Sequence, residues 1–219
     1  MKTELKRIPE KEVLHFLGWR GAPIEAPLME RIAALSDEVI RSVQPRVMMR
    51  RFRIEEGGRL EGTVFSPTGE SIRRMLAPCH ETVLLAATLG AQSERMLLRM
   101  QAKDAAQALV LDAVLSAAIE AVCDEAENDL RTKLSGEGLY LTDRFSPGYG
   151  DMPLAQTREI CEVLNAAKTI GLTVSGSGIM IPRKSVTAVM GISHAPVLRR
   201  ARGCAGCAMR ESCPLAEKE

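Results

Sequence analysis

The chain has 219 residues, of which 46% are hydrophobic, and this suits one large domain with a buried core. Its 29 basic and 28 acidic residues give a formal net charge of +1. This balance argues against a nucleic-acid or membrane surface as the main partner, because both attract a clear basic excess. The charged N-terminus is unlike a secretory signal, and no apolar run is expected to reach membrane-spanning length.

Six cysteines without an export signal indicate reduced thiols and a cytoplasmic protein, in which metal binding is favoured over a disulfide framework.

The first two predicted elements are helices. Residues 8–19 place Pro9 at a first-turn position, and apolar residues recur behind it at helical spacing. Residues 26–43 carry one apolar stripe and predict a second, longer helix. Residues 46–66 change to an alternating pattern around Glu56, Gly57 and Gly58. They predict a hairpin whose second strand contains Leu60, Val64 and Phe65.

The rest of the chain mixes helices and strands without regular alternation. A short helix is predicted at 71–76, a buried strand at 81–90 and a late strand at 185–193. Long helical patterns cover 91–134, with a break near 103–104, and 154–174, ended by Gly171. The predicted fold is therefore α+β: a single domain with a twisted, mainly antiparallel sheet flanked by long helices, over residues 1–198, followed by a basic, cysteine-rich tail at 199–219.

The loop at residues 143–151, DRFSPGYGD, holds one of only two tyrosines in the chain. Tyr149 stands between two glycines, which let the backbone bend closely around a ligand. Arg144 has a permanent charge suited to a carboxylate, and the Tyr149 ring suits a cation. The alternative is a structural turn in which Arg144 forms a local salt bridge and Tyr149 caps the core. The charged run 120–129 is interpreted as mostly a solvated helix face.

A second polar segment, residues 178–194, places Pro182 before the late strand and Lys184, Ser185 and Thr187 near its start. Alone, it also fits a strand with one polar face and an exposed His194.

Together these two segments resemble the activation (reactivation) domain of cobalamin-dependent methionine synthase, in its free-standing form. The family pattern Arg-x-x-x-Gly-Tyr is present as Arg144, Gly148 and Tyr149, and a later pattern is present as Met180, Pro182, Ser185, Val186 and His194. The resemblance covers about residues 10–195. It departs from the family at Trp19, which lacks an acidic neighbour of the expected kind, and at 194–196, where Ala195 separates His194 from Pro196.

The resemblance implies that the loop binds S-adenosylmethionine. Arg144 and the backbone near Phe145 and Ser146 would hold the ligand's polar parts, Tyr149 would lie near the sulfonium, and Glu120 would favour its positive charge. The residues expected to bind the ligand are Glu120, Arg144, Phe145, Ser146, Gly148, Tyr149, Ser185 and His194.

The tail contains a Cys-x2-Cys-x5-Cys cluster formed by Cys204, Cys207 and Cys213. Clustered thiolates bind soft metals, and Cys213-Pro214 favours an iron–sulfur cluster over zinc. A fourth ligand is expected among Cys79, Cys123, Cys161, His80 and His194. The alternative is a tail with free thiols.

The resemblance implies a reductive methylation of cob(II)alamin on a separate methionine synthase that lacks its own activation domain. An iron–sulfur cluster in the tail would relay the electron or receive it from flavodoxin or ferredoxin, a role that is a hypothesis from the cysteine spacing and not from the resemblance. Two alternatives stay open: reactivation of another corrinoid methyltransferase, and a non-catalytic module that senses S-adenosylmethionine or docks on a cobalamin protein and holds zinc in its tail. No general acid or base is expected, because the task is positioning.

Overall fold

The computed structural model describes residues 4–19, 21 and 23–197. The predicted tail at 199–219, with Cys204, Cys207 and Cys213, lies outside the described residues. The division of the chain at residue 198 and the metal cluster therefore stay predictions.

The centre of the fold is an antiparallel sheet with the strand order β1-β2-β6-β3. Its strands are β1 (Arg46–Arg53), β2 (Glu81–Thr88), β6 (Ser185–Ser193) and the two-residue β3 (Tyr140–Leu141). The central strand β2 pairs with β6 along its full length, with Leu85 opposite Ala188. A separate ribbon joins β4 (Thr173–Val174) to β5 (Met180–Ile181). The predicted α+β class with a mainly antiparallel sheet is confirmed.

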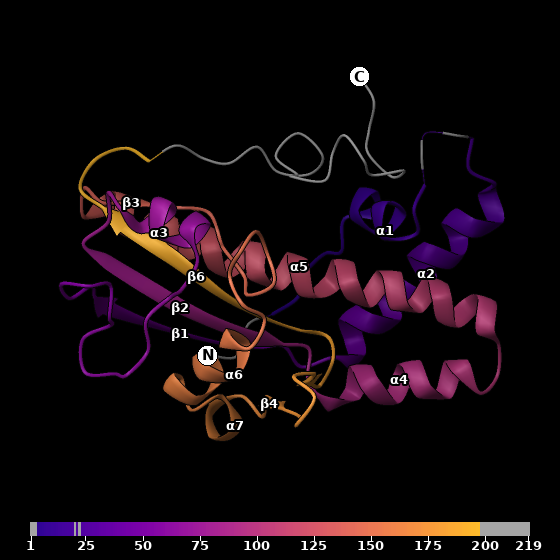
Figure 1. The fold of residues 1–219 in the computed structure, drawn as a ribbon. Coiled ribbons are helices and arrows are strands. Elements are labelled where there is room, and N and C mark those ends of the chain that lie inside the picture. Colours follow the sequence, from indigo (N-terminus) through magenta and orange to yellow (C-terminus); the bar gives the residue numbers. More distant parts are fainter. Residues whose placement is uncertain (1–3, 20, 22, 198–219) are drawn as a thin grey trace.

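Helices cover both faces of this sheet (Figure 1). They are α1 (Glu10–Phe16), α2 (Ala26–Ser42), α3 (Glu70–Leu76), α4 (Ala91–Gln101), α5 (Ala105–Gly136), α6 (Gln156–Val163) and α7 (Ala166–Thr169). In Figure 1, α5 runs along the sheet and beyond it, and α1, α2 and α4 gather around the half that extends past the strands.

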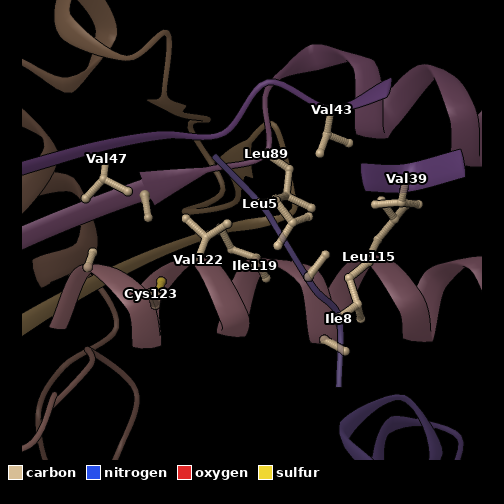
Figure 2. Packing of buried hydrophobic residues seen from close by; sticks show 14 of the residues in the cluster. Leu5, Ile8, Val39, Val43, Val47, Leu89, Leu115, Ile119, Val122 and Cys123 are labelled. Carbon is tan, nitrogen blue, oxygen red and sulfur yellow. The ribbon is translucent and has the colours of Figure 1, made fainter. Parts of the chain in front are cut away.

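Alternating residues of β2 face two separate cores, because successive side chains of a strand point to opposite faces. Val83 and Leu85 belong to a first core with α1, α2, α4 and α5. Leu84 and Ala86 belong to a second core with α3, α6, α7 and Phe145. This two-sided burial explains the continuous apolar sequence of β2. The first core also takes in Leu5, Ile8 and other labelled side chains around α5 (Figure 2).

The helix α5 is the main core element of the domain. It meets by length and composition the criteria for a membrane span, with a mean hydropathy of 1.7 over its most apolar 18 residues. The expectation that no apolar run reaches this length is wrong in that respect. However, 56% of that window is buried inside the domain, including the fully buried Val114, Leu115 and Val122. Protein packing therefore accounts for the apolar character of α5.

Several predicted boundaries are confirmed. Helix α1 begins directly after Pro9, which is its N-cap and not a first-turn residue. Helix α5 begins directly after its N-cap Asp104, whose carboxylate accepts a hydrogen bond from the Gln107 N–H at 3.0 Å. That cap is the predicted break in the helical run 91–134.

Two predicted elements differ from the structure. The second strand of the hairpin at 46–66 is reduced to one bridge between Ile54 and Leu60, and Val64 is 98% exposed. The helix predicted at 154–174 is divided at Asn165, which adopts a left-handed conformation with φ +50°.

Candidate functional site

The loop at 143–151 begins where the chain leaves the edge strand β3. The Thr142 N–H donates to the Gly191 carbonyl at 2.9 Å, and Phe145 exchanges two backbone hydrogen bonds with Val189, at 2.9 and 2.8 Å. The two residues between Thr142 and Phe145 therefore lie opposite the single residue Met190. This two-against-one arrangement is that of a β-bulge, which redirects the side chains that follow it.

The bulge sends consecutive side chains to different faces of the sheet. Phe145 is 2% exposed and packs in the second core, whereas Arg144 reaches the carboxylates of α5 on the other face. The backbone N–H and C=O of Phe145 are both bonded to Val189. Phe145 thus anchors the loop to the sheet, and its backbone groups, which were expected to hold the ligand's polar parts, are used by this pairing.

The tip of the loop holds Tyr149 outside the core. The Gly148 N–H donates to the Met152 carbonyl at 2.9 Å, the Tyr149 N–H donates to the Ser146 carbonyl at 3.1 Å, and the two glycines have φ values of +91° and +54°. Such values favour glycine, because a Cβ strains them. The Tyr149 side chain is 68% exposed and so does not cap the core. The other part of the structural-turn alternative, a salt bridge from Arg144, is present.

The end of the loop is fastened to the first turn of α3. Asp151 accepts hydrogen bonds from the backbone N–H groups of Glu70, at 2.5 Å, and Ser71, at 2.9 Å. The N–H of Ser71, together with that of Glu70, lowers the pKa of Asp151 to about 2. The contact is close, since a Cβ at Gly150 would lie 2.9 Å from the Ser71 hydroxyl oxygen. Helix α3 and the loop tip therefore form one unit.

Arg144 is surrounded by three carboxylates on one face of α5. Its Nη2 lies 3.2 Å from Glu120 Oε2 and 2.5 Å from Asp124 Oδ1, and its Nε lies 3.1 Å from Glu127 Oε2. Its side chain is only 13% exposed. Its Nη1 is buried and has no hydrogen-bond partner among the described residues.

The three carboxylates differ in their access to water. The side chains of Glu120 and Asp124 are 41% and 42% exposed, whereas that of Glu127 is fully buried. Burial raises the pKa of Glu120 above its ordinary value; Arg144 opposes this rise, and the negative charges of Asp124 and Glu12 add to it. This part of α5 is therefore an acidic surface that covers the guanidinium of Arg144.

Glu127 and Arg131 connect this surface to the start of the loop. Arg131 Nη2 lies 2.8 Å from Glu127 Oε1 and 3.6 Å from Asp143 Oδ1. The same guanidinium donates to the backbone carbonyls of Leu141 and of Thr142, the latter at 3.2 Å. Two arginines thus fix the loop to α5 through the buried Glu127.

Ser185 and His194 lie at opposite ends of β6, nine residues or roughly 30 Å apart along the strand. The Ser185 hydroxyl lies 2.6 Å from the Pro182 carbonyl and 2.8 Å from the Thr88 hydroxyl, which gives it a structural role at the strand start. The exposed His194 ring stacks on His80, with ring centroids 3.9 Å apart. The structure therefore places Glu120 beside the loop. It does not bring Ser185 and His194 into one site, because they lie at opposite ends of β6.

The cysteines proposed to complete the tail cluster are dispersed. Burial raises the pKa of Cys79 and of Cys161 to about 11 and that of Cys123 to about 12. Within the described residues, no group of three or more histidine, cysteine or acidic side chains is arranged to hold a metal ion.

Two surface cavities lie away from the loop. One of about 310 Å³ lies between α6, α7 and β4, and one of about 180 Å³ lies beside β3. Neither is lined by a residue of the loop 143–151.

Sequence reasoning missed three residues of this site: Asp124, Glu127 and Asp151. The interpretation of 120–129 as a solvated face is wrong for Glu127. The signal was present, because Glu120, Asp124 and Glu127 follow the i, i+4, i+7 spacing of a single helix face. The position of Asp151 beside α3 depends on a contact across 80 residues that no local pattern indicates.

Comparison with known proteins supports the fold. No protein-family profile matches the chain, and no curated protein is significantly similar to it. Among solved structures, it is similar to the MetH reactivation domain bound to AdoHcy, with a TM-score of 0.59 and 16% sequence identity. The similarity covers 89% of this chain and 77% of the other. At this identity the likeness shows a shared fold.

Proposed function

We propose that this protein binds S-adenosylmethionine at the loop 144–149 and supports the reductive methylation of cob(II)alamin on a separate corrinoid protein. The observation that carries the proposal is the coincidence of motif and fold. The Arg144-x-x-x-Gly148-Tyr149 pattern occupies a loop of a domain similar to a reactivation domain, and that domain was solved with AdoHcy, the demethylated form of S-adenosylmethionine. The client we propose is a methionine synthase that lacks its own activation domain.

The charges around the loop fit a cationic ligand. S-adenosylmethionine carries a sulfonium, an ammonium and a carboxylate. Glu120 and Asp124 are half-exposed carboxylates beside the loop, and Tyr149 presents an exposed ring that attracts a cation through its negative face. The Nη2 of Arg144 contacts these two half-exposed carboxylates, and the ligand's carboxylate can reach the guanidinium there by exchanging with them.

From the sequence, Arg144 is expected to be available to the ligand, but in the structure the α5 carboxylates already occupy much of its guanidinium. Its Nε and Nη2 already contact α5 carboxylates, and its Nη1 is buried. A ligand carboxylate therefore pairs with Arg144 by exchanging with a partner of Nη2. The ammonium and sulfonium of the ligand compensate for such an exchange, because they bring new cations to Glu120 and Asp124.

The chemistry that this positioning serves is a methyl transfer. One electron from an external donor reduces Co(II) to Co(I), which then attacks the sulfonium methyl group; the C–S bond breaks, and its electron pair remains on sulfur. The protein holds the ligand and excludes water, and it needs no proton-transfer group for this step. We propose flavodoxin or ferredoxin as the donor. Cys204, Cys207 and Cys213, which lie outside the described residues, would hold an iron–sulfur cluster if one is bound, and such a cluster would supply one-electron chemistry.

A reconstitution tests the function. Cob(II)alamin on a candidate client is mixed with a reductant, methyl-labelled S-adenosylmethionine and the full chain, and labelled methylcobalamin is measured. We expect label transfer that depends on this protein and falls strongly with Tyr149→Ala. A methionine synthase and another corrinoid methyltransferase, tested side by side, identify the client. Ligand binding without label transfer to either client would favour a sensing module and contradict the proposal.

A further inference from the structure

Glu127 is a carboxylate that contacts both arginines of the site. Its side chain is fully buried. Its Oε2 lies 3.1 Å from Arg144 Nε and its Oε1 lies 2.8 Å from Arg131 Nη2. Each carboxylate oxygen therefore has its own guanidinium partner. A glutamine amide has an acceptor oxygen at one of these positions and an NH2 donor at the other, so it cannot keep both contacts.

The partners of Arg144 fall into two kinds. Glu120 and Asp124 contact Nη2 from the half-exposed side, where solvent or a cationic ligand has access to them. Glu127 contacts Nε from the buried side, where a ligand has no access. Ion pairs with exposed carboxylates are weak and exchange readily, whereas removing one partner of a buried pair leaves an uncompensated charge.

Arg131 extends this linkage to the backbone. It donates to the carbonyls of Leu141 and Thr142 and faces Asp143, the residues that lead directly into the loop. Glu127 therefore contacts the side chain of Arg144 directly and fixes the backbone before it through Arg131. These two routes determine where the guanidinium of Arg144 lies.

We infer that Glu127 is the positioning residue that holds Arg144 in place for the carboxylate of an amino-acid-bearing nucleoside ligand. Arg144 keeps its buried contact with Glu127 and exchanges the partners of Nη2 when ligand binds. The role of Glu127 in ligand selection rests on the proposed function; its hold on Arg144 does not.

The test compares two ligands and two variants of the full chain. S-adenosylmethionine carries the carboxylate, and 5′-methylthioadenosine keeps the nucleoside and sulfur but lacks the amino-acid part. Glu127→Gln should weaken binding of S-adenosylmethionine about tenfold, the loss expected when one charge-assisted hydrogen bond is misplaced. The affinity for 5′-methylthioadenosine should not change. Glu125→Gln is the matched control, because Glu125 lies on the same helix but pairs with Lys6 at 3.7 Å.

An equal loss for both ligands would show that Glu127 supports the fold without positioning Arg144, and would overturn the inference. Glu127→Asp keeps the charge on a shorter side chain. It provides the same two-ligand comparison if Glu127→Gln does not fold, with the same outcomes supporting or overturning the inference.

A ligand-free measurement separates this inference from the proposed function. The Nε–Hε signal of Arg144, assigned with Arg144→Lys, should be protected from solvent exchange in the wild type and lose that protection in Glu127→Gln. Unchanged protection would overturn the inference even if ligand binds. Conversely, a wild-type chain that binds no S-adenosylmethionine but shows the protected signal contradicts the proposed function and leaves the Glu127–Arg144 linkage supported.

Discussion

At the scale of single residues, the acidic surface of α5 supports the proposed binding of a cationic ligand. Glu120 is half-exposed beside Arg144. Its pKa is raised by burial and by neighbouring carboxylates. A raised pKa means that Glu120 loses its charge at a higher pH than an ordinary glutamate does. As the pH falls, Glu120 therefore loses its negative charge before an ordinary glutamate would.

Binding of S-adenosylmethionine should therefore weaken as the pH falls toward and through the raised pKa of Glu120, starting above the ordinary value of 4.5. The Glu120→Gln variant should bind more weakly at neutral pH and show little change over the same pH range. Isothermal titration at a series of pH values checks this. Wild-type and variant curves that run parallel would rule out Glu120 as the titrating group.

A second residue-scale prediction concerns Asp151, whose pKa of about 2 is set by the N–H groups of Ser71 and Glu70. An aspartate in an unfolded chain titrates near pH 4. Because the folded-state pKa is lower, the stabilisation is fully present above the unfolded value and is lost as the pH falls through the folded value. Between about pH 4 and pH 2 the wild type should lose stability more steeply than Asp151→Asn, as measured by urea unfolding. Equal dependence of stability on pH in the two proteins would contradict a stabilising contact between Asp151 and the first turn of α3.

At the scale of elements, α5 combines two functions on different faces. One face fills the first core, and another presents Glu120, Asp124 and Glu127 to the loop. The apolar spacing that identifies α5 could be read from the sequence, and so could its start at Asp104. The bulge after β3 could not, since it depends on pairing between residues 142–145 and 189–191, and strand pairing is not visible in a local pattern.

The Leu115→Ala variant tests whether the core-forming face of α5 and its acidic face are independent. Leu115 is fully buried in the first core, so its truncation should cost about 2–5 kcal/mol of unfolding free energy. It is absent from the ion-pair network, and the affinity for S-adenosylmethionine should stay within about twofold of the wild type. Chemical denaturation and calorimetry measure the two quantities. A variant that loses much affinity while folded would show that the core and the site are coupled.

At the scale of the whole molecule, the α+β class, the buried β2 strand and the loop motif were predictable from sequence, because periodicity and glycine placement are local signals. The strand order was not predictable, and neither were the distant residues that contact the loop. Asn165 divides a helix that its apolar spacing predicts to be continuous, and Ser185 serves the strand start instead of the loop. The loop was predicted from its residues, whereas its buried partners needed the tertiary structure.

The most direct test of the account is a calorimetric titration of the folded, full-length protein with S-adenosylmethionine, in parallel with Tyr149→Ala. The account predicts saturable binding at one site per chain, weakened by about tenfold or more in the variant, in which a cation–ring contact is lost. Absence of binding to the folded wild type, or equal affinity in the variant, would contradict it.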